Sequence, residues 1–179
     1  MAYADPGTFT SGTVGTAAEM NVIADDVRYL KAASDLAALA GVSLARTSSQ
    51  SIPNSSSTAI SWSAANLDVG GWWTSGATFT VPVGTVPAGY TSAVVEIQAS
   101  ARFDVNSAGA RTIEVTQNGT VVEQSFTTSG LPSDTTPVAV TVWAEVVDGD
   151  ALQVLVVQSS GGALNCSHAS VHARRVGAV

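Results

Sequence analysis

The sequence predicts a mainly β protein, with strands from residue 47 to the end of the chain. Residues 93–105 alternate between apolar side chains and polar or charged ones, which is the period of a strand with one buried face. Asn118-Gly119 lies between two further alternating runs, and this dipeptide favours a two-residue hairpin turn with positive φ at both positions. Asp148-Gly149-Asp150 separates two more runs. Because 45% of the 179 residues are hydrophobic, the chain can bury one good core.

The first 46 residues have a different pattern and are predicted to form an arm and a short amphipathic helix. Asp5-Pro6-Gly7 resists regular structure, so we expect residues 1–13 to be extended. Thr16 and Glu19 have the spacing of a capping box, in which each side chain bonds the other residue's backbone amide. The helix is therefore expected to begin there and to end near Ser34 or Gly41. The predicted domains are residues 1–46, for attachment or oligomerisation, and residues 47–179.

The predicted helix has one apolar stripe that needs a cover. Its members recur at spacings of three, four and three residues, and they are Met20, Ile23, Val27 and Leu30. A short helix is marginal alone, so the cover is two sister helices, the surface of a larger partner, or the protein's own β domain. We assign attachment or oligomerisation to these four residues.

The predicted strands differ in how many faces they bury. Residues 49–54 and 57–62 indicate an edge strand and its continuation. Residues 138–146 alternate, with one apolar face. Residues 152–157 are apolar on both faces, and such a strand needs a second covering layer, for which a neighbouring subunit is the candidate. Small residues in the final strand, 167–176, would allow close approach near a symmetry axis.

The order of these segments, together with Phe79-Thr80-Val81-Pro82 and Gly89-Tyr90, resembles the C1q/TNF-like jelly-roll sandwich over about residues 47–179. That resemblance implies a trimerising module without catalytic machinery, whose first and last strands pair in an inner sheet facing the threefold axis. It implies a homotrimer. The subunit interface residues that we expect are Leu155, Val157, His168 and His172.

A second resemblance concerns the biological context. Gly12, Thr16, Ala17 and Asn21 form a G-x-x-x-T-A-x-x-x-N segment, within residues 8–30, that is similar to the start of many tailed-phage structural proteins. It implies a virion protein of a bacteriophage: a capsid decoration, a head fibre or a minor tail protein. The expected partners are phage capsid or tail proteins. The alternative is a tip module that binds a host surface glycan or receptor.

The residues that could bind a ligand are few. Trp72-Trp73 follows two glycines, so one indole is a candidate stacking platform, although a tryptophan that caps the core explains the pair as well. His168 and His172 lie four apart on one strand face and could hold a transition metal or respond to pH, but ordinary interface residues fit them better. No aspartate loop has calcium-site spacing. We expect no metal and no cofactor.

Other function classes are disfavoured by composition. The net charge of −7 opposes phosphate backbones, so no nucleic acid is expected. No apolar run approaches the roughly 20 residues of a spanning helix, and no secretory signal is apparent, so no membrane insertion is expected. The single Cys166 cannot form an intrachain disulfide. It lies two residues from His168, on the same face of a regular strand, but no orienting acid accompanies them, so we expect no enzyme activity.

Overall fold

The computed structural model describes residues 25, 27, 40–127, 130–131 and 133–179. The chain divides into two compact units between Ala38 and Leu39. In the first unit only Asp25 and Val27 are described, and both are helical and exposed. The predicted arm and the rest of the predicted helix lie outside the described residues. No helix within the described part of the chain has the length and apolar character needed to cross a membrane.

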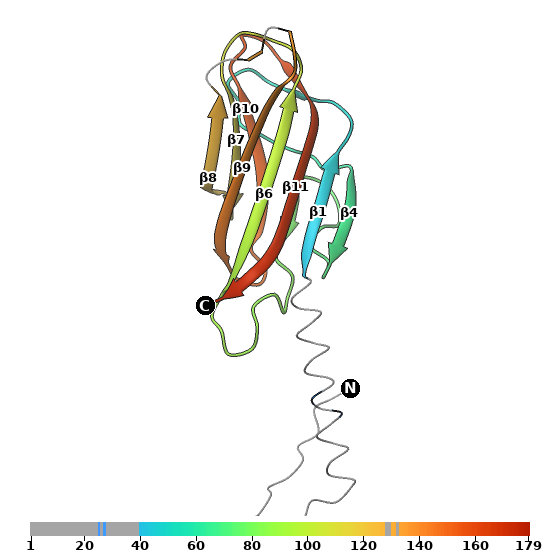
Figure 1. The fold of residues 1–179 in the computed structure, drawn as a ribbon, viewed down its shortest axis with the longest axis vertical. Helices are drawn as coiled ribbons and strands as arrows, with labels where there is room; N and C mark the ends of the chain where they lie inside the picture. The colour runs from blue at the N-terminus through green and yellow to red at the C-terminus, as the bar shows by residue number, and fades with distance from the viewer. Residues whose placement is uncertain (1–24, 26, 28–39, 128–129, 132) are drawn as a thin grey trace, which may run out of the picture. The chain divides into compact units, whose positions relative to one another are not determined.

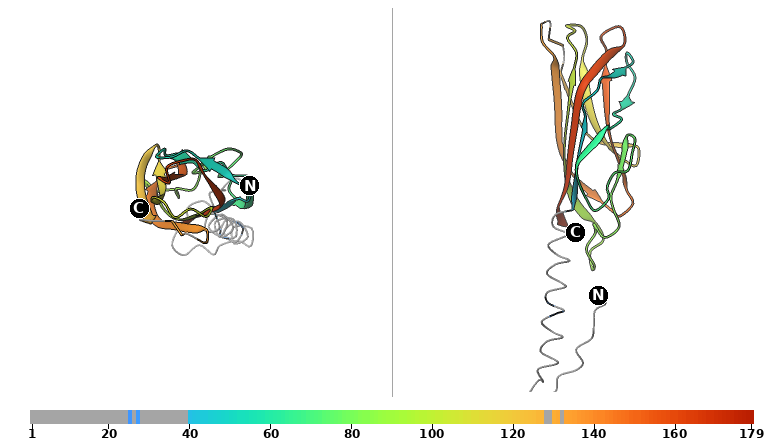
Figure 2. Two further views of the ribbon diagram at one scale, coloured as in Figure 1. Left: turned by 90° about the horizontal axis from the view of Figure 1, so that it is seen from above. Right: turned by 90° about the vertical axis from the view of Figure 1, so that its right-hand side faces the viewer.

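The second unit is a two-layer antiparallel β sandwich (Figures 1 and 2). Among the described residues, sheet I contains six strands and sheet II contains five. The order in sheet I is β4 (Ala64–Val69), β1 (Gly41–Arg46), β11 (Leu164–Ala178), β6 (Ala93–Phe103) and β9 (Thr136–Val146), with β2 (Gln50–Ile52) paired to β11. The order in sheet II is β3 (Thr58–Ala59), β10 (Ala151–Gln158), β7 (Arg111–Gln117) and β8 (Thr120–Thr127), with β5 (Thr78–Thr80) paired to β10.

The core lies between the two sheets and uses the alternation that the sequence shows. In β6, Val95, Ile97 and Phe103 are fully buried, and every second side chain along the strand points outward. In β9 the inward positions are the predicted valines and Ala144. Leu152, Val154 and Val156 of β10 face them from sheet II. These facing rows supply the hydrophobic stabilisation of the fold, because each buried side chain removes most of its apolar surface from water.

The predicted hairpin between β7 and β8 is confirmed. Asn118 has φ of 52° and Gly119 has φ of 82°, as a type I′ turn requires. Asp150 holds the adjacent turn: its carboxylate accepts hydrogen bonds from Gln117 Nε2, Asn118 Nδ2 and the amide of Val147 at 2.7–2.8 Å. The two turns at this end of the sandwich are therefore joined through one carboxylate.

The β domain begins earlier than residue 47. Strand β1 pairs with β11 on one side and β4 on the other, and Leu44 is fully buried. The Ala- and Leu-rich stretch before Arg46 suggests helix, and a six-residue strand buried at almost every position shows no period of two. The boundary therefore moves from residue 46 to Ala38/Leu39.

One further prediction about strands needs correction, and one strand was missed. Residues 49–54 and 57–62 do not form one edge strand, because β2 joins sheet I whereas β3 joins sheet II, and the chain crosses between layers around Pro53. Strand β4 was not predicted, since Ala64–Val69 is mostly exposed and lacks a clear apolar face.

Candidate functional site

The outer face of sheet I has a central row of small side chains. The register places Ala45, Ser170, Ser100 and Ala139 side by side on four adjacent strands. Ser100 Oγ and Ser170 Oγ are 2.9 Å apart and share a hydrogen bond. Because no long side chain rises from this row, another surface can approach the sheet closely.

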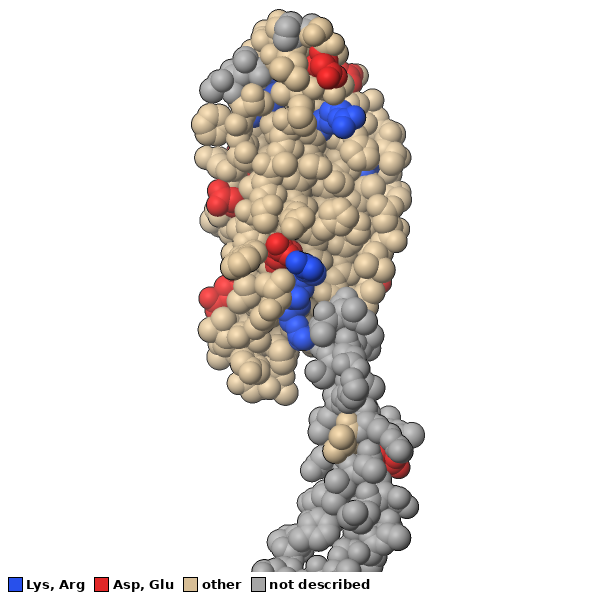
Figure 3. Space-filling view, in the orientation of Figure 1, with Lys and Arg blue, Asp and Glu red and all other residues tan. Residues whose placement is uncertain are grey.

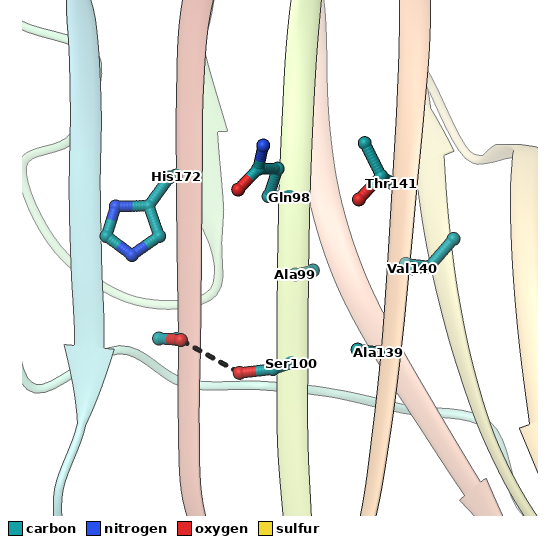
Figure 4. A pocket seen from close by; sticks show the side chains of 8 residues that line it. Gln98, Ala99, Ser100, Ala139, Val140, Thr141 and His172 are labelled. Carbon is teal, nitrogen blue, oxygen red and sulfur yellow. Dashed lines mark hydrogen bonds between the residues drawn. The ribbon is translucent and has the colours of Figure 1, made fainter.

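A shallow hollow lies on this face, between β11, β6 and β9 (Figure 4). Its volume is about 200 Å³. The outward side chains that line it are Gln98, Ser100, Ala139, Thr141, Ser170 and His172. The small residues of the central row leave this space, and the longer side chains of Gln98 and His172 border it.

Charge on this face is sparse (Figure 3). Arg174 and Glu96 form an ion pair, in which Arg174 Nε and Nη2 both lie 2.7 Å from Glu96 Oε2. Hydrogen bonds from Arg174, and then from Gln98, lower the pKa of the Glu96 carboxyl below its ordinary value. The pair is thus internally neutral, and the centre of the face carries only uncharged groups.

Trp143 stands at the β9 edge of the same face. It pairs in register with Glu96, and it is 72% exposed, the largest exposed aromatic side chain in the described part of the chain. The sequence analysis did not select it. The signal was present, because the apolar alternation of residues 138–146 assigns Trp143 to the outward side.

The two histidines are both exposed on the outer face of sheet I, as their spacing predicts. Cys166 does not share that face. A β-bulge between Cys166 and His168 inserts Ser167 and reverses the alternation, so the thiol points into the core. Burial raises the pKa of the Cys166 thiol. The Cys–His arrangement considered from sequence is therefore not formed.

The same bulge changes the role of the small residues in the final strand. Ala169 and Ala173 are buried and face the core, whereas Ser170 faces outward between the histidines. The small residues expected to allow close approach near an axis are Ala169, Ser170 and Ala173, and this expectation is wrong for the two alanines. Close approach on this face depends instead on Ser100, Ser170 and Ala139, because Ala45 of the same row is buried.

Leu155 and Val157 lie on the other side of the sandwich, on the outer face of sheet II. Both are half-buried, and their neighbours in register include Ala59 and Thr112. Phe126, which is 66% exposed, lies beside Thr112 on β8. The four predicted interface residues are thus divided between opposite faces, so a contact that uses a single face of the sandwich cannot include all of them.

Trp72 and Trp73 do not form an exposed platform. Trp72 is 1% exposed and belongs to the core, and Trp73 is half-buried with its Nε1 donating to the carbonyl of Gly76. The Asp68 carboxylate fixes this segment by accepting from the amides of Gly71, Trp72 and Trp73. Trp72 is therefore wrong as a ligand contact, and the alternative that it caps the core fits.

The aspartates near the loops hold the loop backbone in place by accepting hydrogen bonds from its amides. Asp148 accepts from the amides of Gly84 and Val86, much as Asp68 does in its own loop. Within the described ranges, no three His, Cys, Asp or Glu side chains gather in a way that could hold a metal ion.

The predicted attachment stripe is mostly outside the described residues. Met20, Ile23 and Leu30 are among the residues that the structure does not describe. Val27 is 58% exposed.

Solved structures with the same arrangement of strands include proteins of animals and of a virus. The globular domain of the zebrafish complement 1qA protein matches with 11% identity and a TM-score of 0.57, over 78% of this chain and 99% of that one. Eiger TNF from S. frugiperda matches with 11% identity and a TM-score of 0.56, over 79% and 94%. The vertex protein of the phage PRD1 matches with 16% identity and a TM-score of 0.57, over 76% and 72%.

The sequence itself matches no family model, and it matches none of the curated proteins. At these identities the structural likeness shows the fold alone. Two antiparallel sheets, in the strand order given above, form a β domain with the C1q/TNF-like jelly-roll fold.

Proposed function

We propose that this protein is a non-enzymatic structural protein of a bacteriophage virion, a homotrimer that displays its jelly roll and attaches through its N-terminal segment. The observation that carries the proposal is the outer face of sheet I. Its central row of small uncharged residues offers a second copy of the chain a surface without bulky or charged obstacles. The first and last strands of the domain, β1 and β11, pair in this sheet, as the resemblance implies.

The contact that we propose is heterologous: the β9 edge of one copy packs on the outer face of sheet I of the next. Trp143 is an exposed aromatic anchor at that edge, and buried aromatics contribute most to stable contacts. The hollow beside Ser100 and Ser170 is the matching depression. A head-to-tail contact that closes after three copies gives a ring with one threefold axis.

The virion context is supported by two observations. The G-x-x-x-T-A-x-x-x-N segment is similar to the start of tailed-phage structural proteins, and one solved structure with this fold is a phage vertex protein. Capsid decoration, head fibre and minor tail protein are the locations that we propose. Catalysis is not part of the proposal.

The test uses particles that lack this component. Full-length protein, the fragment 39–179 and a variant with Ile23→Asp and Val27→Asp are added to such particles, and the amount that co-sediments is measured. We expect only the full-length protein to bind, because two charges on the apolar stripe would have to be desolvated on docking. Binding of the fragment at the full-length level would show that attachment lies in the jelly roll.

A second candidate function is recognition of a host surface glycan, and the exposed indole of Trp143 beside the Glu96 carboxylate favours it. One substitution separates the two functions. If Trp143→Ala converts the trimer to a folded monomer, Trp143 belongs to the subunit contact. If the variant stays trimeric but loses signal on a glycan array, Trp143 belongs to a sugar site.

A further inference from the structure

We propose that the subunit contact over sheet I is gated by pH through His172 and His168, and that it opens as the pH falls below about 6.5. The inference rests on the proposed function, because it requires the outer face of sheet I to be the contact. It adds the regulation of that contact.

His172 has the position that such a gate needs. In register it lies between Ser43 of β1 and Gln98 of β6, and it borders the hollow that we assign to the neighbouring copy. The imidazole extends from β11 toward β1 (Figure 4). It is exposed in the single chain, so packing of a second copy over this face would remove it from water.

The charged groups on the same face include no carboxylate without another partner that could pair with protonated His172. Arg102 and Glu96 come from β6, Glu145 from β9 and Arg174 from β11. Arg174 holds Glu96, and Glu145 accepts a hydrogen bond from Ser92 Oγ. The facing residues of β1 and β9 in the His172 row, Ser43 and Thr141, are neutral.

The protonation state of the histidines therefore decides the charge of this face. With both imidazoles neutral, Arg102 and Arg174 balance Glu96 and Glu145. Protonation of His168 and His172, the 2 histidines of the chain, adds two positive charges to this face of each subunit. A trimer would bring all three such faces together, and like charges at a desolvated contact repel.

The sign of the effect follows from burial. A contact that excludes water disfavours the imidazolium, so the assembled state binds fewer protons than the separate subunits do. Assembly is then complete above the ordinary histidine pKa of about 6.5 and is lost as the pH falls below it. Because a trimer buries three copies of His172, the loss of assembly at low pH is steeper than for a single histidine.

The experiment is sedimentation velocity of the full chain between about pH 8 and pH 5, at constant ionic strength, in one series without EDTA and one series with it. This range stays above the ordinary pKa of glutamate. The samples are the wild type, His172→Gln, His168→Gln and the double variant, which contains no imidazole. Far-UV circular dichroism on each sample separates dissociation from unfolding.

We expect the wild type to be a trimer at pH 8 and a folded monomer at pH 5, with the double variant trimeric throughout. His172→Gln should remove most of the pH dependence, since His172 borders the hollow. The gate is overturned if the wild type is trimeric at pH 5, or if the double variant dissociates over the same range. It is also overturned if EDTA alone dissociates the trimer at pH 8, because the histidines would then hold a metal.

A monomer at pH 8, in the wild type and in every variant, would overturn the trimer itself, and the gate with it. A pH-independent trimer would overturn the gate alone. The two failures are thus distinguishable.

Discussion

Single carboxylates hold the turns of this sandwich, and Asp150 and Asp68 each accept three hydrogen bonds. Burial by itself would raise the pKa of Asp150, but hydrogen bonds from Asn118, Val147 and Gln117 outweigh burial and hold the pKa of Asp150 below its ordinary value. A group whose pKa is lower in the folded state stabilises the fold above its unfolded pKa and loses that effect as the pH falls.

We therefore expect Asp150→Asn to reduce the free energy of unfolding at pH 7 by about 2 kcal/mol, since an amide cannot accept all three hydrogen bonds. The difference between wild type and variant should narrow below about pH 4. Urea unfolding at several pH values measures it. Asp134→Asn, in an exposed loop, is the control and should change little. A constant difference down to pH 2 would contradict the account.

Close approach between backbone segments is the other feature of single residues that affects stability. Gly109 has φ of +69°, and a Cβ there would lie 2.0 Å from the carbonyl oxygen of Ser159. Gly119 also has positive φ, +82°, but a Cβ there would meet open space. The two glycines differ only in whether backbone blocks a side chain.

Gly109→Ala should cost about 3 kcal/mol or more, because two loops must separate. Gly119→Ala should cost about 1 kcal/mol, which is the strain of the left-handed conformation alone. Thermal and urea unfolding of both variants give the comparison. Equal losses would mean that the two loops do not pack as the structure has them.

At the scale of elements, the sequence predicts long regular strands well and short or irregular ones poorly. Strands β6, β9 and the β7–β8 hairpin follow from alternation and from Asn118-Gly119. Strand β1 does not, because it is buried along almost its whole length. Bulges are also invisible in the pattern: the extra residue at Ser167 turns Cys166 inward and separates it from His168. The sequence also could not predict the candidate site in full. Trp143, Glu96 and Arg174 are neighbours only through the register of three strands, which the sequence pattern does not show.

The position of β1 makes a specific prediction about truncation. A fragment that begins at residue 39 keeps every strand of sheet I and should fold. A fragment that begins at residue 47 lacks β1, which leaves β11 and β4 without their shared partner and removes the buried Leu44. Circular dichroism and limited proteolysis distinguish them. Two equally folded fragments would show that β1 contributes little to the domain.

For the whole molecule, the trimer that we propose raises the question of which outer face meets another copy. Sheet I offers small uncharged residues, a hollow and the exposed Trp143, whereas sheet II offers the half-buried Leu155 and Val157 and the exposed Phe126. From the sequence, Leu155 and Val157 stood out as apolar residues and His168 and His172 as polar ones, and all four were assigned to one interface. The structure separates the two faces, and each can therefore be changed without altering the other.

The most direct test is the mass of two matched variants of the full chain at pH 8, measured by native mass spectrometry at micromolar concentration. Ser100→Lys places a charge at the centre of the sheet I face, and Leu155→Lys places one on sheet II beside Glu114. The account predicts that wild type and Leu155→Lys are trimers, and that Ser100→Lys is a folded monomer because the contact cannot desolvate an unpaired ammonium group. A trimeric Ser100→Lys variant together with a monomeric Leu155→Lys variant would contradict it and place the contact on sheet II.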